Sequence, residues 1–227
     1  MQVAPTTLQW AELEYLALRH AELSEASLHR ITEHVIKRGA AASLRTLDLT
    51  GARVHGREFS KLEAGLHQCT ALCKLALGGN PCFGLIGAQS LASALPVLSS
   101  CLQELDLAGS ELRDDGLRAL GAGVGAGLRQ LRVLRLGSNK ISDAGLREWS
   151  ALPPCVPRLA ELGLEHNLIA LRQEAAAAFC GFLSQQTRVR AVDLRWQGVA
   201  VLSAGRLRVR KHTQKLAREG RRVVVEM

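Results

Sequence analysis

Aromatic side chains are scarce in this chain. Phenylalanine, tryptophan and tyrosine make up 4% of the residues, although 47% of all residues are hydrophobic. A core with so few rings must be filled by aliphatic side chains, which fits stacked rows of leucine better than the pocketed interior of an enzyme. No apolar run approaches the ~18 residues that span a bilayer. The first residues also lack the basic start and apolar centre of a secretory signal.

The chain has few cysteines, and they are scattered. The six are Cys69, Cys73, Cys82, Cys101, Cys155 and Cys180. No C-x-x-C pair is followed by a second pair, so we interpret them as small buried thiols rather than as a metal site or redox pair. Cys82, for example, stands where other copies of the pattern described below have Leu112 and Ile141. We expect a cytoplasmic, reducing compartment; a nuclear, ciliary or cytoskeletal location stays open.

Catalytic signatures are missing as well. The chain has no G-x-S-x-G or H-E-x-x-H stretch and no glycine-rich dinucleotide turn. The glycines near Gly79 and Gly84 are not followed by the Lys-Ser/Thr pair of a phosphate-binding loop. We therefore expect no enzymatic activity, no cofactor and no metal.

One pattern recurs along almost the whole chain. The stretch LRVLRLGSNKI, residues 131–141, fits L-x-x-L-x-L-x-x-N-x-L. Copies begin at Leu13, Leu44, Leu72, Leu102, Leu131, Leu159 and Val189, with steps of 28 to 31 residues. A degraded eighth copy has Val223 and Val225 at its two inner apolar positions. Each unit has one narrow apolar edge, so only stacking against neighbours can bury it.

This sequence pattern resembles the ribonuclease-inhibitor-like leucine-rich repeat. The resemblance implies an α/β solenoid, a right-handed horseshoe arc of seven to eight repeats, with a parallel sheet on the concave side and helices on the convex side. We expect one domain over residues 1–227: an N-terminal lid (1–12) in which Trp10 covers the first leucines, repeats (13–200), and a basic C-terminal helix with a terminal strand (201–227).

The connectors between strands predict helices. They cover residues 24–38, 58–68, 87–95, a stretch starting at Asp114 or Asp115, a stretch capped by Asp143, 170–186 and 201–218. Ser24 or Ser27 can cap the first helix, and Pro96 should stop the third. The glycines at 121, 123, 125 and 127 should make the fourth short or irregular, because each costs about 1 kcal/mol against alanine.

Residues between the ladder leucines should point into the open curve, where folding places few demands on them. The candidate contact residues are Tyr15, Arg19, Asp48, Lys74, Asp106, Arg135, Glu161, Glu165, Asp193, Arg195 and Trp196. Five acidic residues form a ragged stripe here. Trp196 stands at a position held by glycine in three copies, and exposed tryptophan is a residue type that dominates interface energetics. Two alternatives stay open: the stripe is a solvated face, and Trp196 is a plug over the last core layer.

The positive charge is concentrated near the C-terminus. Residues 206–222 carry eight basic residues against Glu219, a net charge of +7, which leaves only +1 of the total +8 for the remaining chain. The basic residues are Arg206, Arg208, Arg210, Lys211, Lys215, Arg218, Arg221 and Arg222. The segment can contact nucleic acid, an anionic membrane or an acidic protein. A polar capping helix is the reading we favour, since no aromatics interleave with these charges.

These observations together predict a non-catalytic scaffold that binds another protein through the concave sheet face. Within the resembled family, the Ran GTPase-activating protein has an enzymatic effect, but no residue match carries that role over. A GTPase-activating accessory protein is therefore the alternative, with a structural subunit anchored by its basic end as the third. The edge of the last strand, near Val223 to Val225, invites self-association or a partner strand.

Overall fold

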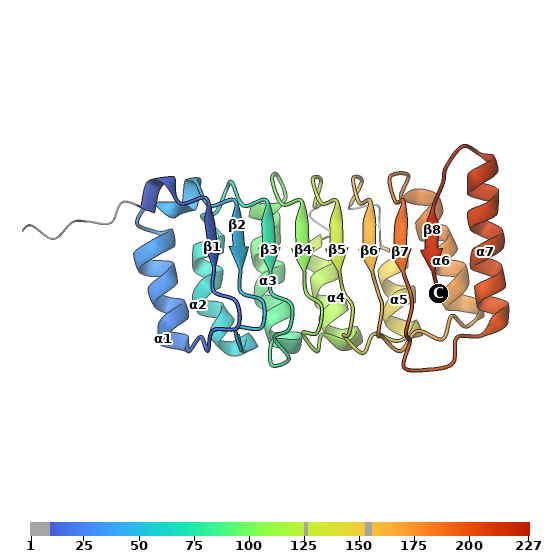
Figure 1. Cartoon of the computed structure of the whole chain (residues 1–227), viewed down its shortest axis with the longest axis horizontal. Helices are drawn as coiled ribbons and strands as arrows, with labels where there is room; N and C mark the ends of the chain where they lie inside the picture. Colours follow the sequence, from blue (N-terminus) through green and yellow to red (C-terminus); the bar gives the residue numbers. More distant parts are fainter. Residues whose placement is uncertain (1–9, 125–126, 153–155) are drawn as a thin grey trace, which may run out of the picture.

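The described residues of the protein form one parallel sheet of eight short strands in sequential order. The computed structural model describes residues 10–124, 127–152 and 156–227. The strands are β1 (Tyr15–Ala17), β2 (Thr46–Asp48), β3 (Lys74–Ala76), β4 (Glu104–Asp106), β5 (Val133–Arg135), β6 (Glu161–Gly163), β7 (Ala191–Asp193) and β8 (Val224–Glu226). Neighbouring strands lie side by side along the whole length of the molecule (Figure 1).

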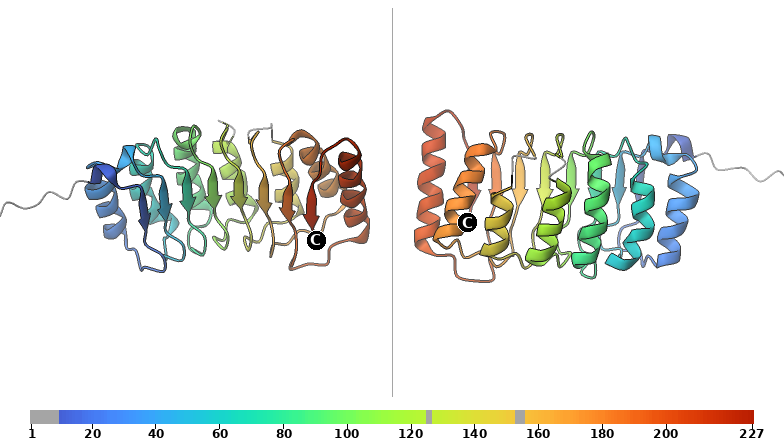
Figure 2. Two further views of the ribbon diagram at one scale, coloured as in Figure 1. Left: turned by 45° about the horizontal axis from the view of Figure 1, so that its top comes forward. Right: turned by 180° about the vertical axis from the view of Figure 1, so that it is seen from behind.

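Helices cover the opposite side of the sheet (Figure 2). They are α1 (Glu25–Arg30), α2 (Gly56–Leu66), α3 (Gly84–Leu98), α4 (Arg113–Val124), α5 (Asp143–Ser150), α6 (Gln173–Gln185) and α7 (Ser203–Arg218). The π-helical segment η2 (Ile31–Ile36) continues α1, and η1 (Trp10–Glu12) and η3 (Ala40–Ala42) are short 3-10 helices. A helix is about 10 Å wide, whereas paired strands are about 4.8 Å apart. Each repeat is therefore wider on its helix side than on its strand side. Stacked repeats of this shape bend towards their strands, so the sheet lines the concave side. The predicted α/β leucine-rich-repeat solenoid is confirmed.

The core consists of aliphatic rows that run across the repeats. The middle residue of each strand aligns with its neighbours in register. From β2 to β7 this row is Leu47, Leu75, Leu105, Leu134, Leu162 and Val192, each at most 2% exposed. One row thus extends through six repeats, which is why no single unit closes a core by itself. Phe179, Phe182 and Leu183 of α6 are buried, as predicted.

Buried amides at the ninth position of the pattern bind neighbouring repeats together. Asn139 accepts the N–H groups of Ser110 and Leu112 at 3.0 and 3.2 Å, and it donates to the carbonyls of Leu107 and Gly137 at 2.7 and 3.1 Å. Asn80, Asn167 and Gln197 make equivalent bonds. The asparagine therefore satisfies backbone groups that the turn would otherwise bury unpaired.

The register of the eighth copy differs from the prediction by two residues. Val225 pairs with Val192, so it occupies the first inner position of the pattern rather than the second. Val223 precedes the strand, and Met227 takes the second inner position. Both valines pack with the core, so the spacing alone did not fix which of them takes the first inner position.

The third and fourth helices were predicted wrongly. Pro96 lies inside α3, which continues to Leu98, and α4 is helical over 12 residues that include Gly121 and Gly123. Gly125 lies outside the described residues, and Gly127 follows the helix. Both observations involve the contact between α3 and α4. Pro96 has no N–H for the carbonyl of Ala92, and Gly123 of α4 packs directly against the Ala92 backbone, where any Cβ would collide. Gly123 is therefore a close-packing position between helices rather than a weakness.

Two helix starts also differ from the prediction. Ser142, not Asp143, caps α5, and its hydroxyl accepts the N–H of Ala144 at 3.1 Å. The Asp143 carboxylate instead accepts the N–H groups of Leu171 and Arg172, both at 2.9 Å, in the next repeat. Asp143 thus holds the turn of the next repeat in place, and a rule about the capping of its own helix does not predict this role.

Asp114 repeats this arrangement one unit earlier. The helix α4 begins at Arg113, so neither Asp114 nor Asp115 precedes it as a cap. Asp114 accepts the N–H of Ser142 at 2.8 Å, while Asp115 pairs with Arg118 at 2.6 Å.

The predicted burial of the cysteines and the predicted N-terminal lid are each confirmed only in part. Cys69 and Cys180 are buried as expected, but Cys82 is exposed, because the neighbouring Phe83 fills the apolar position instead. Cys155 lies outside the described residues, as do residues 1–9 of the lid. Trp10 is half-buried against the core, and Ser24 is the residue that caps α1.

Candidate interaction surface

The outer surface of the strands, here called the sheet face, gathers the predicted contact residues. In-register pairing aligns the first and third residues of the strands into two rows. The first row is Tyr15, Thr46, Lys74, Glu104, Val133, Glu161, Ala191 and Val224, and the second is Ala17, Asp48, Ala76, Asp106, Arg135, Gly163, Asp193 and Glu226. Arg19, Glu165 and Arg195 follow the second row by two residues. The candidates thus share one face, but they are spread from the first repeat to the seventh.

The middle of the sheet face is occupied by ion pairs within the chain. The Lys74 ammonium lies 2.8 Å from a Glu104 carboxylate oxygen, and Arg135 approaches the same oxygen at 3.8 Å. All three side chains are partly exposed. Such pairs contribute little to stability, but they neutralise this part of the face.

Three aspartates of the acidic stripe serve the fold. Asp48, Asp106 and Asp193 each accept the backbone N–H two residues ahead, at 2.9 to 3.1 Å. Each carboxylate therefore fixes the turn that leaves its strand. The stripe is thus partly a structural device of the repeat.

Asp48 is the most enclosed of these carboxylates, with 3% of its surface exposed. Burial alone would raise its pKa, but bonds from the Thr50 hydroxyl and N–H, and then from Arg19, outweigh it and lower the pKa. Arg19 Nε lies 2.6 Å from the carboxylate. At this end of the sheet, Arg19 is therefore the exposed partner and Asp48 its buried anchor.

A notch opens in the sheet face at Gly163. A cavity of about 220 Å³ lies here, bordered by Arg135, Glu161, Glu165 and Asp193. Gly163 has no side chain to fill it, and the Glu165 side chain lies along the sheet close to Gly163 and Gly137. The notch brings four charged groups of three repeats around one small hollow.

The eighth position of the pattern adopts a left-handed backbone in every repeat from the first to the seventh. Its residues are His20, Gly51, Gly79, Gly109, Ser138, His166 and Trp196, with φ between 53° and 69°. Glycine takes this conformation without penalty, whereas other residues are disfavoured there by about 1–2 kcal/mol. A bulky residue at positive φ is a clear outlier.

His20, Ser138 and His166 also adopt this left-handed backbone, and Trp196 is the bulkiest residue at this position. Trp196 is also the most exposed large hydrophobic residue described, at 71%. Its indole stacks on the His166 imidazole of the preceding repeat, with ring centres 6.3 Å apart and planes 11° from parallel. An end plug over the core would be largely covered. Trp196 instead stands on the surface beside the last full strand.

Arg195, next to Trp196, is held by two carboxylates. It pairs with Asp193 at 2.6 Å and with Glu226 of β8 at 3.1 Å. The hydrogen bond from Arg195 lowers the pKa of Asp193, and the bond to Asp193 raises the pKa of Arg195. This guanidinium has few ways to move, which reduces the entropy lost when a partner contacts it.

Exposed apolar side chains concentrate in the same end of the molecule. Of nine exposed large hydrophobic residues described, six belong to residues 168–224: Leu168, Trp196, Val199, Leu202, Leu207 and Val224. This part of the chain therefore exposes more large apolar side chains than the rest of the described residues.

The basic segment divides into structural and free charges. Arg221 donates to the carbonyls of Leu183, Ser184 and Gln186 at 2.8 to 3.1 Å, so it closes the C-terminal end of α6. The other seven basic side chains belong to exposed residues. Lys215 lies 3.9 Å from Glu219.

Neither a metal site nor a membrane span is found in the part of the chain that the structure describes. No three or more metal-binding side chains come together, and no helix has the length and apolarity needed to cross a bilayer.

Sequence reasoning did not single out three residues that complete the surface. Glu104 receives the central ion pairs, His166 supports the indole, and Glu226 fixes Arg195. His166 occupies the same repeat position as Trp196 in the neighbouring copy, so the repeat pattern alone could have predicted that the two rings lie side by side. Glu226 was hidden by the shifted register of the last copy.

Comparison with known proteins supports the repeat. A family model described as "Leucine Rich repeat" matches residues 98–121 and 128–148, which cover β4 with most of α4 and β5 with much of α5. Among solved structures, the chain is similar to "Leiomodin-1 Actin-Binding Site 2 (ABS2)", with a TM-score of 0.50 and 15% identity over 73% of this chain and 91% of that chain. At this identity the likeness concerns the fold. No curated protein matches the chain by sequence.

Proposed function

We propose that this protein is a non-catalytic scaffold that binds another protein through the sheet face, with Trp196 at the centre of the contact. One observation carries the proposal. A large, 71% exposed indole is kept at a backbone position where the chain uses glycine in three other repeats.

The Trp196 side chain leaves 71% of its surface exposed, and its intramolecular ring contact is with His166. This partial burial offsets the backbone strain about evenly, so the fold gains no net stability from a tryptophan at this position. Backbone strain of about 1–3 kcal/mol persists where function maintains it. Tryptophan and arginine are the side chains most often found at energetic centres of interfaces, and here Arg195 adjoins Trp196.

The surroundings suit a protein partner. The notch at Gly163 offers a hollow of about 220 Å³ two repeats away from the strand edge, with carboxylates and an arginine on its border. Polar groups around a central aromatic anchor form the usual pattern of a protein contact. The repeat fold itself is generally used for protein interaction.

Affinity capture with quantitative mass spectrometry tests the proposal. The wild-type chain is compared with Trp196→Gly and with Leu85→Ala, an equally apolar change at an exposed residue of α3 on the other side of the molecule. We expect a specific set of proteins that is lost with Trp196→Gly and retained with Leu85→Ala. Equal capture by all three chains would show that the sheet face around Trp196 is not the contact surface.

The alternatives are tested separately. The similar leiomodin-1 fragment is described as an actin-binding site, so cosedimentation with actin filaments is a direct first assay and would favour a cytoplasmic or cytoskeletal location. Acceleration of GTP hydrolysis by a small GTPase would support the Ran-activator alternative. The third alternative, anchoring in an assembly through the basic end, depends on α7.

A further inference from the structure

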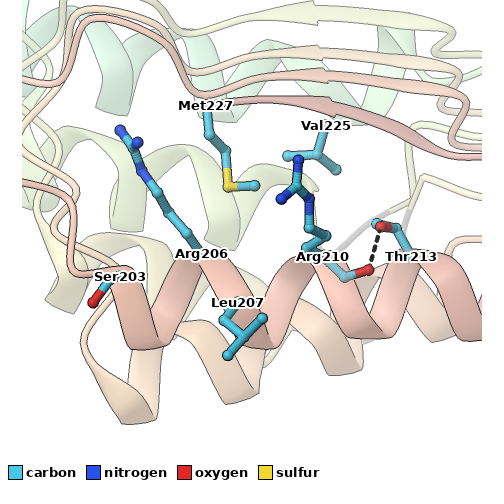
Figure 3. Close-up of a pocket in the computed structure, with 7 residues that line it drawn as sticks. All are labelled: Ser203, Arg206, Leu207, Arg210, Thr213, Val225 and Met227. Carbon is cyan, nitrogen blue, oxygen red and sulfur yellow. Dashed lines mark hydrogen bonds between the residues drawn. The ribbon is translucent and has the colours of Figure 1, made fainter.

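A second candidate surface lies at the C-terminal end of the solenoid, apart from the sheet face. A groove of about 590 Å³ separates α7 from β8. One face of α7 supplies Ser203, Arg206, Leu207, Arg210 and Thr213, and β8 with its following residue supplies Val225 and Met227. Figure 3 shows Arg206 and Arg210 extending from α7 towards the strand, on either side of the Met227 side chain.

The strand beside this groove has a free edge in the described structure, because β8 pairs only with β7. The Val224 N–H donates to the carbonyl of Arg190, the residue before β7, at 2.8 Å. Successive N–H groups of a strand point to opposite edges. The Val225 N–H and the carbonyls of Val223 and Val225 therefore point away from β7.

In the inner repeats, the same groups are satisfied by the next strand. The N–H of Leu49 donates to Ala76, and the N–H of Leu194 donates to Glu226, both at 2.7–2.8 Å. Met227 is the equivalent residue after β8, so its N–H also faces the free edge. An added strand would find donors and acceptors ready at the same spacing.

Charge selects what kind of strand fits. Residues 206–222 carry a net charge of +7, and Arg206 and Arg210 have no carboxylate partner within the described part of the chain. A second copy of this protein would bring two such segments together, which like-charge repulsion opposes. A nucleic acid would use the charges, but neither the strand edge nor the apolar Val225 and Met227.

The spacing of the two arginines adds a further requirement. Residues four apart on a helix have Cβ atoms about 5–6 Å apart. Alternate residues of a strand point to the same side and are about 6.6 Å apart. Two carboxylates at positions i and i+2 of an added strand would therefore face Arg206 and Arg210 together.

We propose that the β8 edge and the α7 groove bind an extended acidic segment of another protein, as an added strand whose alternate carboxylates pair with Arg206 and Arg210. The backbone edge contributes affinity, and the arginine pair contributes the choice of sequence. This site is separate from Trp196, so it stands or falls without the proposed sheet-face contact.

Fluorescence anisotropy with synthetic peptides tests the site on the full chain. The probe is a fluorescein-labelled peptide TVEVEVT, and the matched control is TVEEVVT, which has the same composition and charge but only one glutamate on each strand face. We expect the probe to bind about tenfold more tightly than the control. Equal affinity of the two peptides would overturn the proposed arginine spacing.

Variants separate the charge from the backbone contribution. Arg206→Gln with Arg210→Gln should weaken probe binding about tenfold, whereas Lys211→Gln with Arg218→Gln, the same change in net charge outside the groove, should weaken it less than about twofold. Equal losses would mean attraction by net charge alone and would overturn the proposal.

The strand edge is tested by Val225→Pro, which removes the N–H that faces away from β7 and leaves the N–H groups that face β7 in place. It should weaken binding about fivefold relative to Val225→Ala, which controls for the lost side chain. If Val225→Pro does not fold, a probe N-methylated at its central valine makes the same test from the peptide side. Unchanged binding of that probe, or a dimer in sedimentation that the peptide cannot displace, would overturn strand addition.

Discussion

Of two substitutions at Trp196, glycine should leave the protein more stable than alanine, which is the reverse of the usual ranking. For Trp196→Gly, relief of the left-handed backbone should gain about 1–2 kcal/mol. Glycine also raises the conformational entropy of the unfolded chain, which lowers the stability by about 0.4–1 kcal/mol. The side chain is 71% exposed, so its covered part is roughly 70 Å², worth about 1.8 kcal/mol. The terms nearly cancel, and we expect a net change within about 1 kcal/mol.

Trp196→Ala is the informative companion. Alanine loses the same ring contacts with His166 but keeps a Cβ at φ 58°. In an ordinary helix or strand, glycine is less stable than alanine by about 0.5–1 kcal/mol. Here the order should reverse, so that Trp196→Gly is more stable than Trp196→Ala by about 0.5–1 kcal/mol.

Urea denaturation followed by circular dichroism measures both variants. Trp149→Ala serves as the reference for a core tryptophan, because Trp149 is only 7% exposed, and it should lose about 3–5 kcal/mol. A loss above about 2 kcal/mol for Trp196→Gly would identify the indole as a plug of the last core layer. An alanine variant more stable than the glycine variant would refute the strain argument.

Three further outcomes follow from the buried polar groups and thiols. Asn139→Ala leaves the N–H groups of Ser110 and Leu112 buried without acceptors, so it should lower the free energy of unfolding by about 2–5 kcal/mol in the same urea assay, whereas Ser110→Ala should lose about 1 kcal/mol. The pKa of Asp48 is lowered in the folded state, so the ionised group stabilises the fold above the ordinary aspartate pKa of about 3.9, and this contribution disappears as the pH falls through the lower native pKa. Asp48→Asn should therefore be less stable at pH 7 and show a shallower loss below about pH 4 in thermal melts at a series of pH values; parallel pH profiles of the two chains would contradict this. Burial raises the pKa of the Cys69 thiol to about 12, so iodoacetamide at neutral pH should modify the exposed Cys82 and leave Cys69 unmodified until urea unfolds the chain, as read by peptide mass spectrometry.

The repeat made the fold predictable from the sequence. Seven copies in one frame predicted one strand per repeat, and in the structure β1 to β7 each occupy the third to fifth positions of their copy. A single copy would not have done so. The outward positions followed from the same frame, which is why the candidate contact residues share one face.

Interactions between repeats were the part that sequence could not supply. Gly123 reads as a helix breaker in isolation, and only the neighbouring Ala92 backbone turns it into a packing position. Asp143 reads as a cap, yet it binds the turn of the next unit. Local rules describe a helix with its own ends, whereas a solenoid places part of each unit's bonding in the following one.

The left-handed position shows how such a repeat separates structure from function. The eighth position has a left-handed backbone in each of the first seven copies, and Gly51, Gly79 and Gly109 adopt it at no steric cost. A costly residue at an equivalent position is therefore evidence that the fold did not choose it. Trp196 is the largest such departure, and it lies one residue from Arg195, which Glu226 ties to β8. Because repeat units contact only their neighbours, a strand bound at the β8 edge would reach the sheet face through that arginine, and the two proposed surfaces can be tested for coupling by measuring each in the presence of the other's ligand.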